Sequence, residues 1–270
     1  MPSPRLPISR PRALSVARRI IPMVENFFRR VTPGIETLRS SFSLPRHRHL
    51  GAYATVVLAG RFEESGYLGR IHAAAGDVLI HPVLDCHANL LVRGGVQLLR
   101  LDWPREAPEG GLYRLNDIDD IARTAEKDVR AATLLLAESL ARVRSRAPGI
   151  RNDWPDVLAQ RLAAGAGELG AWAASQGIAR ETVSRGFAAA YGVPPAIFRA
   201  ELRARAAWLR ITRDRDTLSA IAVDTGFADQ AHMTRWVHRI TGAPPAAWRR
   251  YESHRHTILA TPSMSERLLT

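Results

Sequence analysis

The chain of 270 residues contains little cysteine and little lysine. Cys86 is the one cysteine, so the sequence excludes an internal disulfide and a zinc site built from several thiolates. This cysteine usage is typical of a reducing compartment, and we expect a cytoplasmic protein. We interpret Cys86 as a small packed residue rather than as a redox sensor.

Long apolar runs are missing as well, since no stretch approaches the roughly 20 residues that cross a bilayer. Residues 1–42 are rich in arginine and proline and lack the compact apolar segment and cleavage site of a signal peptide. We expect them to form a basic, partly disordered N-terminal arm, although a basic amphipathic helix over residues 13–30 is an alternative. The sequence therefore favours a protein without a membrane partner.

The charge of the chain is strongly positive, with a formal net charge of +12 at pH 7. Lys127 is the only lysine, so arginine supplies the other 37 of the 38 basic residues. An excess of this size suits a polyanionic partner, either nucleic acid or an anionic membrane surface. An arginine-rich composition also follows from a GC-rich genome, so the charge alone does not identify the partner.

Residues 43–105 have the pattern of short strands separated by turns. Apolar segments at 53–60, 76–82 and 94–101 each begin or end at glycine. Several short strands with turn signals at close spacing predict a β-barrel or a sandwich. Helical periodicity follows this region, so we expect an α+β multidomain protein.

Residues 106–150 have the composition of a linker followed by helices. A helix over 117–126 is predicted after the cap Asn116, and a second helix after the cap Asp128. The second helix carries an apolar stripe of Leu134, Leu135, Leu136, Leu140 and Val143. This stripe favours either the interface of a homodimer or an intramolecular cover for the barrel.

Residues 151–251 show helical periodicity and hold two helix-turn-helix patterns. The first lies at about 169–190 and turns at Gly177, and the second lies at about 218–240 and turns at Gly226. Glycine suits both turns because they need a positive φ. The second helices are predicted over 180–190 and 230–240, with a joining helix over 196–212, and residues 252–270 are expected to form a loose tail.

One such hairpin also occurs in ordinary helical bundles. Two copies with arginine on the outer face of the second helix favour a domain that places each second helix in the major groove of DNA.

The order of residues across 155–251 resembles the DNA-binding domain of the AraC/XylS family of transcription regulators. The matching segments are Ser184-Arg185-Gly186-Phe187, Tyr191-Gly192-Val193-Pro194-Pro195, Ile221-Ala222, Gly226-Phe227-Ala228-Asp229-Gln230 and Thr241-Gly242-Ala243-Pro244-Pro245-Ala246-Ala247-Trp248-Arg249. The resemblance implies two helix-turn-helix modules, joined by a long helix, that read half-sites one turn apart on one face of DNA.

The residues expected to contact DNA lie on the outer faces of the two second helices. They are Arg180, Glu181, Ser184 and Arg185 in the first unit, and Gln230, His232, Thr234 and Arg235 in the second. Arginine reads guanine and glutamine reads adenine through paired hydrogen bonds. The sequence departs from the family at Ala179, where a serine N-cap is usual. Glu181 is acidic where DNA approaches, so it either accepts from a cytosine amino group or points away.

Two motifs in the N-terminal half resemble those of cupin barrels, the common sensor domain of AraC-type regulators. The first motif is matched by His47, His49, Tyr53 and Gly60, with Tyr53 where cupins usually have glutamate, and the second by Gly76, Pro82 and His87. The resemblance implies that His47, His49, Tyr53 and His87 line an effector pocket. Glu63, Glu64 and Asp85 are further possible contacts, and His72 and His81 are interpreted as surface or strand residues.

In metal cupins, the matching histidines and the glutamate bind iron, manganese or zinc. His47, His49 and His87 are therefore the candidate ligands for a divalent metal, since three imidazoles can hold Zn²⁺ with an open fourth position. Because the carboxylate is missing at Tyr53, and AraC-type barrels generally sense without a metal, we expect no cofactor.

We therefore expect a homodimeric transcription regulator, an activator without enzymatic activity. Its partners would be double-stranded DNA, RNA polymerase and a small-molecule effector of unknown identity. The alternatives are a metal-dependent cupin enzyme fused to a DNA-binding domain and a constitutive DNA-binding protein with a degenerate barrel.

Overall fold

The computed structural model of the chain describes residues 28–39, 42–91, 94–104, 110–146, 153–165 and 168–260. Residues 1–27, which include most of the predicted arm and of the alternative helix at 13–30, lie outside the described residues. The chain divides into two compact units, and the boundary falls between Leu202 and Arg203. Within the described part of the chain, no helix combines the length and the apolar character needed to cross a membrane.

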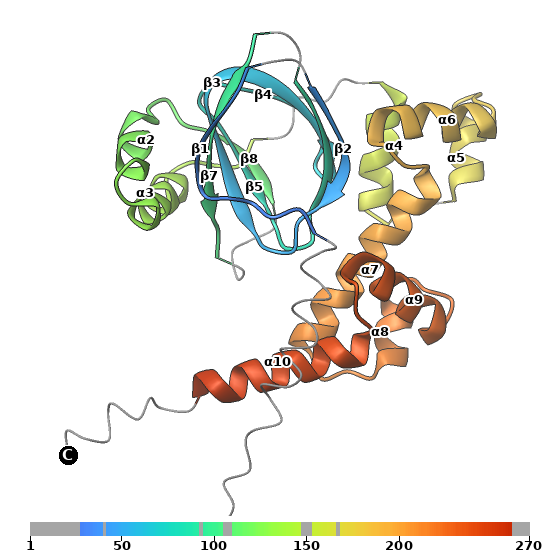
Figure 1. Cartoon of the computed structure of the whole chain (residues 1–270). Helices are drawn as coiled ribbons and strands as arrows, with labels where there is room; N and C mark the ends of the chain where they lie inside the picture. Colours follow the sequence, from blue (N-terminus) through green and yellow to red (C-terminus); the bar gives the residue numbers. More distant parts are fainter. Residues whose placement is uncertain are drawn as a thin grey trace, which may run out of the picture. The chain divides into compact units, whose positions relative to one another are not determined.

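The compact unit that spans residues 28–202 begins with a domain of antiparallel strands that fold over one another (Figure 1). Their bounds are β1 (Gly34–Leu38), β2 (Phe42–Arg48), β3 (Tyr53–Gly66), β4 (Gly69–Ala74), β5 (Asp77–His81), β6 (Cys86–Leu91), β7 (Val96–Asp102) and β8 (Gly111–Arg114).

Strand β3 belongs to both layers of this domain. Its first half pairs with β5 and β7 in a sheet ordered β1-β7-β3-β5-β8, and its second half pairs with β4 and β6, while β6 also pairs with β2. Gly60 stands at the crossing with a φ of 78°, and a Cβ there would lie 2.2 Å from the carbonyl oxygen of Gly95. Among the described strands the ladder does not close, so the predicted cupin-like barrel is an open one.

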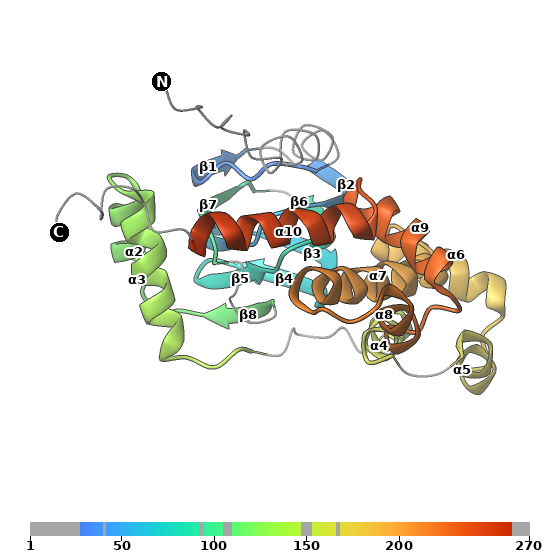
Figure 2. The same ribbon diagram turned by 90° about the horizontal axis from the view of Figure 1, so that it is seen from below.

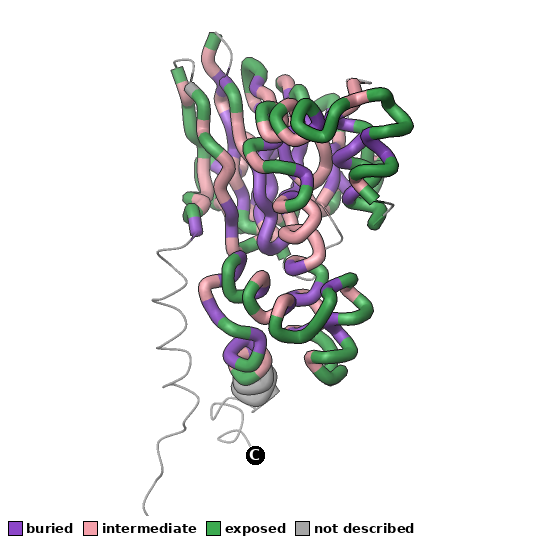
Figure 3. Tube along the Cα trace, turned by 90° about the vertical axis from the view of Figure 1, so that its right-hand side faces the viewer, coloured by how far each residue is buried: buried purple, intermediate pink, exposed green. Residues whose placement is uncertain are grey.

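Alternate residues of the central strands face opposite cores, as the pleat of a strand requires. Val56 and Leu99 belong to a cluster that includes Leu136 of a covering helix, whereas their neighbours Val57 and Leu98 belong to a cluster inside the strand domain. Figure 3 shows the resulting buried segments running along the strands. Burial on both faces explains why the start of β3 is a continuous apolar run.

The strand domain extends beyond the predicted limits of 43–105. β1 pairs with β7 and β8 pairs with β5, so the domain begins at Gly34 and ends at Arg114. β1 is largely exposed and β8 follows a glycine-rich stretch, so neither shows the alternation typical of a strand. β3 also continues past Gly60, where the sequence predicts a strand end, because the charged residues that follow hide the pattern.

Two helices, α2 (Asp119–Ala125) and α3 (Val129–Ala141), pack on the sheet (Figures 1 and 2). The predicted cap Asp128 is confirmed, because its carboxylate accepts hydrogen bonds from the backbone N–H groups of Arg130 and Ala131. Leu136 and Leu140 are buried, so part of the apolar stripe covers the barrel within the chain. Leu134 of the same stripe is 67% exposed and remains available to a partner.

The remaining helices carry the two helix-turn-helix units. Their bounds are α4 (Trp154–Ala163), α5 (Leu169–Ser175), α6 (Arg180–Tyr191), α7 (Pro195–Arg213), α8 (Leu218–Asp224), α9 (Gln230–Thr241) and α10 (Pro245–Ala260). The predicted helices over 180–190, 196–212 and 230–240 are confirmed, each with one more residue at one or both ends. The tail predicted from residue 252 is helical up to Ala260. The boundary between the compact units falls inside α7.

Gly186 lies in the middle of α6, where glycine usually weakens a helix. A Cβ at this position would lie 2.5 Å from Cζ2 of Trp154 and 2.9 Å from its Cη2. The indole of α4 therefore packs directly on the backbone of α6. This close approach explains a glycine in a segment that otherwise has good helix formers.

We predict that Gly186→Ala destabilises the first helix-turn-helix unit by about 1–3 kcal/mol, because overpacking against Trp154 outweighs the gain in helix propensity. The matched control is Gly170→Ala in α5, since a Cβ there meets nothing within 4 Å. The control is expected to keep or raise the free energy of unfolding. Urea unfolding followed by tryptophan fluorescence measures both variants, and equal stability of the two would contradict the prediction.

Candidate functional site

Helix α6 of the first helix-turn-helix unit follows the predicted turn at Gly177, whose φ is 64°. Val183 and Phe187 are buried against α4 and α5, so the opposite face of α6 is turned to solvent. Arg180, Glu181 and Arg185 are exposed, and Ser184 is half-buried. The N-cap Ala179 provides no side-chain hydrogen bond, as its departure from the family pattern predicts.

Helix α9 presents the corresponding face of the second unit. Its first turn is capped by Asp229, whose carboxylate accepts from the backbone N–H of His232 at 2.6 Å. The indole N–H of Trp236 donates to Nε2 of His232 at 3.1 Å, so one ring nitrogen of this histidine is engaged inside the fold. Gln230 and Arg235 are exposed, and His232 and Thr234 are half-buried.

The end of α9 is tied to α10 by a buried threonine. The indole N–H of Trp248 donates to the hydroxyl of Thr241 at 2.8 Å, and this hydroxyl lies 2.7 Å from the carbonyl oxygen of Val237. The tie explains why Thr241 and Trp248 occur together in the last matching segment. It supports the helix whose outer face carries the candidate contacts.

A small cavity lies inside the strand domain. Its lining includes His47, His49, Tyr53 and His87, so the structure brings together the four residues expected to form the effector pocket. The cavity volume is about 30 Å³. Because a water molecule needs roughly 10–15 Å³ of such space, this volume corresponds to very few water molecules.

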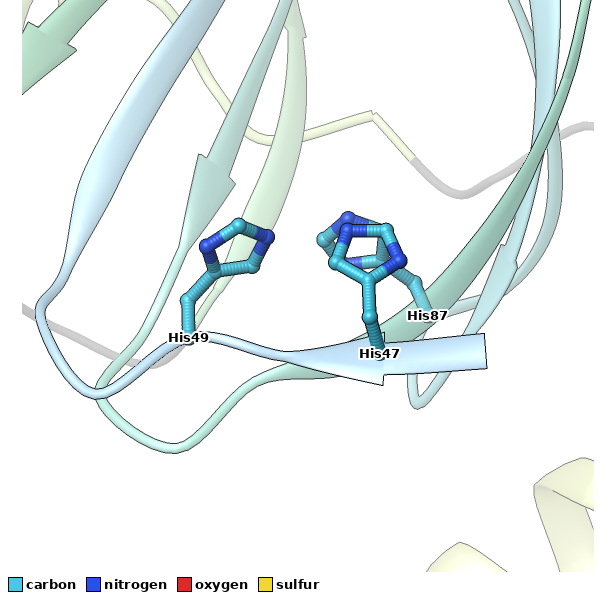
Figure 4. Close-up of side chains that lie close together, drawn as sticks. All are labelled: His47, His49 and His87. Atoms are coloured by element: carbon cyan, nitrogen blue, oxygen red, sulfur yellow. The ribbon is translucent and has the colours of Figure 1, made fainter. Parts of the chain in front are cut away.

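The three histidines of this set lie close together, and each turns one ring nitrogen toward the others (Figure 4). His47 donates its Nδ1–H to the carbonyl oxygen of Pro45 at 3.0 Å, and His49 donates its Nδ1–H to that of Arg29 at 2.8 Å. A carbonyl oxygen only accepts, so the hydrogen must lie on Nδ1 of both rings. In the neutral rings, each Nε2 therefore carries a free lone pair.

The ring of His87 is oriented by a buried carboxylate. Its Nδ1 lies 2.7 Å from Oδ2 of Asp85, which also accepts from Nδ1 of His81 at 3.0 Å. Burial alone would raise the pKa of Asp85, but hydrogen bonds from His81 and His87 hold it well below its ordinary value. Asp85 is therefore an acceptor for both rings. Burial alone would lower the pKa of His87, but the charge of Glu64 and the hydrogen bond to Asp85 raise it above its ordinary value.

The pKa values of the two histidines near β2 are low. Burial, followed by the charge of His87, lowers the pKa of His47 to about 4 and that of His49 to about 2. Both rings are therefore neutral near pH 7, with Nε2 free of a competing proton. Burial raises the pKa of the nearby Cys86 thiol to about 11, so this thiol stays protonated, as expected of a packed residue.

The three histidines fit the divalent metal that cupin barrels can hold. Their donor atoms all lie within 4.8 Å of one another. Metal-ligating histidines typically donate the other ring N–H to a carbonyl or a carboxylate, which is the arrangement of His47, His49 and His87. A metal here would act as a Lewis acid toward a bound ligand or water.

Two further residues join this cluster. His81 lies on strand β5, as one of the two interpretations predicts, but it is buried, lies 3.6 Å from a carboxylate oxygen of Glu64 and stacks on Tyr53. Glu64 is one of the three acidic residues that the sequence leaves unranked, and it lines the cavity. The signal for both is strand register, because Tyr53 pairs with His81 and Glu64 pairs with Asn89. By contrast, His72 is an exposed strand residue, as interpreted.

The outer side of β2 contacts the first helix-turn-helix unit. Arg46 and Arg48 alternate with His47 and His49, and both arginines bind Glu201 of α7, at 2.8 and 3.1 Å. Arg46 also donates to the carbonyl oxygen of Tyr191 at the end of α6, at 3.3 Å. One strand therefore carries cavity residues and residues that bind α7.

A second pair of contacts joins β4 to α4. Nε of Arg70 donates to Oδ1 of Asp156 at 2.8 Å, and the same guanidinium binds Asp153. The hydroxyl of Tyr191 donates to Oδ1 of Asp156 at 2.6 Å. The strand domain is thus bound to both α4 and α6 by charge-assisted hydrogen bonds.

Comparison with known proteins identifies the C-terminal region. Residues 172–251 match the family described as helix-turn-helix domain. None of the curated proteins matches the chain.

Solved structures with similarity to the chain include three kinds. Fatty-acid-bound ToxT from Vibrio cholerae is 9% identical, with coverage of 80% of this chain and 93% of that chain and a TM-score of 0.35. A probable AraC family regulator from Rhodopseudomonas palustris is 19% identical, with coverage of 35% and 93% and a TM-score of 0.33. A cupin superfamily protein from Desulfitobacterium hafniense is 17% identical, with coverage of 26% and 68% and a TM-score of 0.22.

The family match covers both α6 and α9, and the residues that resemble AraC/XylS regulators lie within the same helices and turns. Residues 172–251 therefore form a DNA-binding domain of the AraC type with two helix-turn-helix units.

Proposed function

We propose that this protein is a cytoplasmic, sequence-specific regulator whose DNA affinity is controlled by a small effector in the barrel. The observation that carries the proposal is the pair of helices, α6 and α9, that each bury an apolar face and expose polar candidates. In the proposed mechanism, each helix enters the major groove, at half-sites one turn apart. Arg185 and Arg235 would read guanine, and Gln230 would read adenine.

The remaining candidates have secondary roles in this proposal. Arg180, Thr234 and Ser184 would contact base edges or phosphates near the readers. His232 would use its Nδ1, because Nε2 already accepts from Trp236. Glu181 would accept from a cytosine amino group.

Strand β2 gives the effector a route to the first helix-turn-helix unit. An effector that moves His47 would also move Arg46 and Arg48, because the three residues are neighbours on β2. These arginines bind Glu201, so the position of α7 would respond. The effector would thus favour one arrangement of the unit and change DNA affinity by a population shift.

The expected assembly is a homodimer that activates transcription through RNA polymerase. Leu134 is the residue that supports the dimer, because it leaves part of the apolar stripe of α3 uncovered within the chain. A constitutive DNA-binding protein would show no change in DNA affinity when the barrel is filled.

We predict that the double variant Arg185→Ala, Arg235→Ala loses sequence-specific binding. Each arginine is expected to contribute about 1–3 kcal/mol of binding free energy, because a paired contact to guanine is lost. Selection of binding sites from fragmented genomic DNA, followed by fluorescence anisotropy with the selected sites, measures the loss. The wild-type protein is expected to select two half-sites about one helical turn apart.

The matched control is Arg123→Ala, Arg142→Ala, which removes the same charge from exposed positions of α2 and the end of α3. This control is expected to select the same sites as the wild type. Equal loss in both double variants would show that binding depends on charge alone and would overturn the assignment of readers.

We predict that Glu201→Gln weakens the attachment of the first helix-turn-helix unit to the strand domain. Removal of one partner from a buried ion pair costs roughly 3–5 kcal/mol, because Arg46 and Arg48 stay buried without their counter-charge. Hydrogen–deuterium exchange is expected to increase in α4, α6 and the first half of α7, with the strands of the sheet unchanged.

Glu138→Gln is the control, because its ion pair with Arg142 is exposed on α3 and is worth less than about 1 kcal/mol. Unchanged exchange in α6 and α7 of Glu201→Gln would contradict the proposed route from β2.

A further inference from the structure

Helix α9 carries a row of three interacting side chains, His232, Trp236 and Arg239. Neighbours in this row are four and three positions apart, so they lie next to each other on the helix surface. The indole N–H of Trp236 donates to Nε2 of His232 at 3.1 Å. The guanidinium of Arg239 lies over the indole, 5.0 Å from the ring centroid. The indole is therefore held from both sides, by a hydrogen bond and by a cation–π contact.

The ring of His232 has two further restraints. The ring of Phe227 meets it edge-on, with centroids 5.3 Å apart and an angle of 82° between the planes. Its backbone N–H donates to the carboxylate of Asp229 at 2.6 Å, which fixes the first turn of α9. The side chain is half-buried. These contacts hold the imidazole in one orientation at the start of the helix.

The contact with Trp236 decides which ring nitrogen of His232 carries the hydrogen. An indole N–H donates and never accepts, so Nε2 must present its lone pair. In the neutral ring, the hydrogen then lies on Nδ1. Among the described residues, no atom forms a hydrogen bond with this Nδ1. The neutral ring thus offers one donor, and no free acceptor, to a molecule that binds α9.

A single fixed donor distinguishes among the base edges of the major groove. Guanine presents two acceptors there, adenine an acceptor beside an amino group, and thymine an acceptor beside a methyl group. Cytosine presents only the donor of its amino group. A histidine with its hydrogen on Nδ1 can therefore pair with guanine and not with cytosine. A ring with a free choice of tautomer could also accept from cytosine.

We propose that Trp236 is a positioning residue that fixes His232 as a donor-only reader, which favours guanine and rejects cytosine at its position in the binding site. Trp236 acts through the imidazole, and the base contact is made by Nδ1 of His232. This inference rests on the proposed function, because it takes α9 as a helix that enters the major groove. The tautomer is measured without DNA, so the two proposals can fail separately.

The first experiment measures the tautomer in the full chain, labelled with ¹⁵N-histidine and studied at about pH 8.5, where free imidazole is neutral. Long-range ¹H–¹⁵N spectra separate a ring nitrogen that carries hydrogen from one that has a lone pair. The signals lost in His232→Ala assign the ring. We expect the lone pair on Nε2 in the wild-type protein. Trp236→Phe keeps an aromatic ring without the N–H, and it is expected to move hydrogen from Nδ1 toward Nε2.

The second experiment measures base preference by fluorescence anisotropy. The selected site is varied through all four bases at the position where His232→Ala loses its preference. For the wild-type protein, replacement of guanine by cytosine there is expected to weaken binding about 2- to 10-fold, the equivalent of one hydrogen bond. Trp236→Phe is expected to lose most of this preference and to keep its affinity for non-specific DNA.

The matched control is Trp248→Phe, which also removes an indole hydrogen bond within residues 203–270, the 2.8 Å bond to Thr241. It is expected to keep the wild-type tautomer and base preference. The ring of His238, exposed on the same helix, is expected to give the same signals in the wild type and both tryptophan variants. Circular dichroism checks that each variant is folded, and the wild-type spectrum decides the tautomer in any case.

The proposal is overturned if Nε2 of His232 carries the hydrogen in the wild-type protein. It is also overturned if Trp236→Phe keeps the wild-type tautomer and base preference, or if Trp248→Phe loses them equally. Failure to select any DNA motif would overturn the base reading together with the proposed function, whereas the spectrum would still support or contradict the tautomer.

Discussion

The carboxylate of Glu201 is shared by Arg46 and Arg48 of β2. The arrangement of the first helix-turn-helix unit on the strand domain depends on this carboxylate. Arg46 and Arg48 each take one oxygen, and both guanidinium groups are largely buried. Burying charges costs several kcal/mol per ion even after relaxation, so such a cluster adds little net stability. Its effect is on geometry, because any arrangement that separates the three groups leaves charges buried without partners.

The same strand would give the proposed effector pocket a short path to the first helix-turn-helix unit. His47 of β2 lines the cavity, whereas its neighbours Arg46 and Arg48 bind Glu201 of α7. Successive side chains of a strand point to opposite faces, so a shift of the backbone at His47 would also move both arginines.

The sequence predicts the helical half of this protein well because its signals are local. Each turn, cap and buried stripe of α6 and α9 involves residues a few positions apart, such as Asp229 and His232 or Val183 and Phe187. The barrel is harder to predict, because β1 and β8 become strands only through distant partners. Glu64 and His81 illustrate the limit, since only strand register reveals that they share the cavity with His87.

The contacts between the strand domain and the helices lie beyond any local pattern. Arg46 and Glu201 are 155 positions apart, and Arg70 and Asp156 are 86 apart, so no periodicity connects them. In sequence, these arginines are indistinguishable from the many others that give the chain its positive charge. Only their burial next to carboxylates separates them from arginines available to DNA.

The buried thiol of Cys86 makes the folded chain silent toward thiol-reactive dyes. A cysteine introduced on an exposed position of α2 or α10 would then be the single reactive thiol of the molecule. Fluorescent probes could be attached at one chosen point without first removing a native cysteine. The motions of the two compact units could thus be followed in solution with the barrel left unaltered.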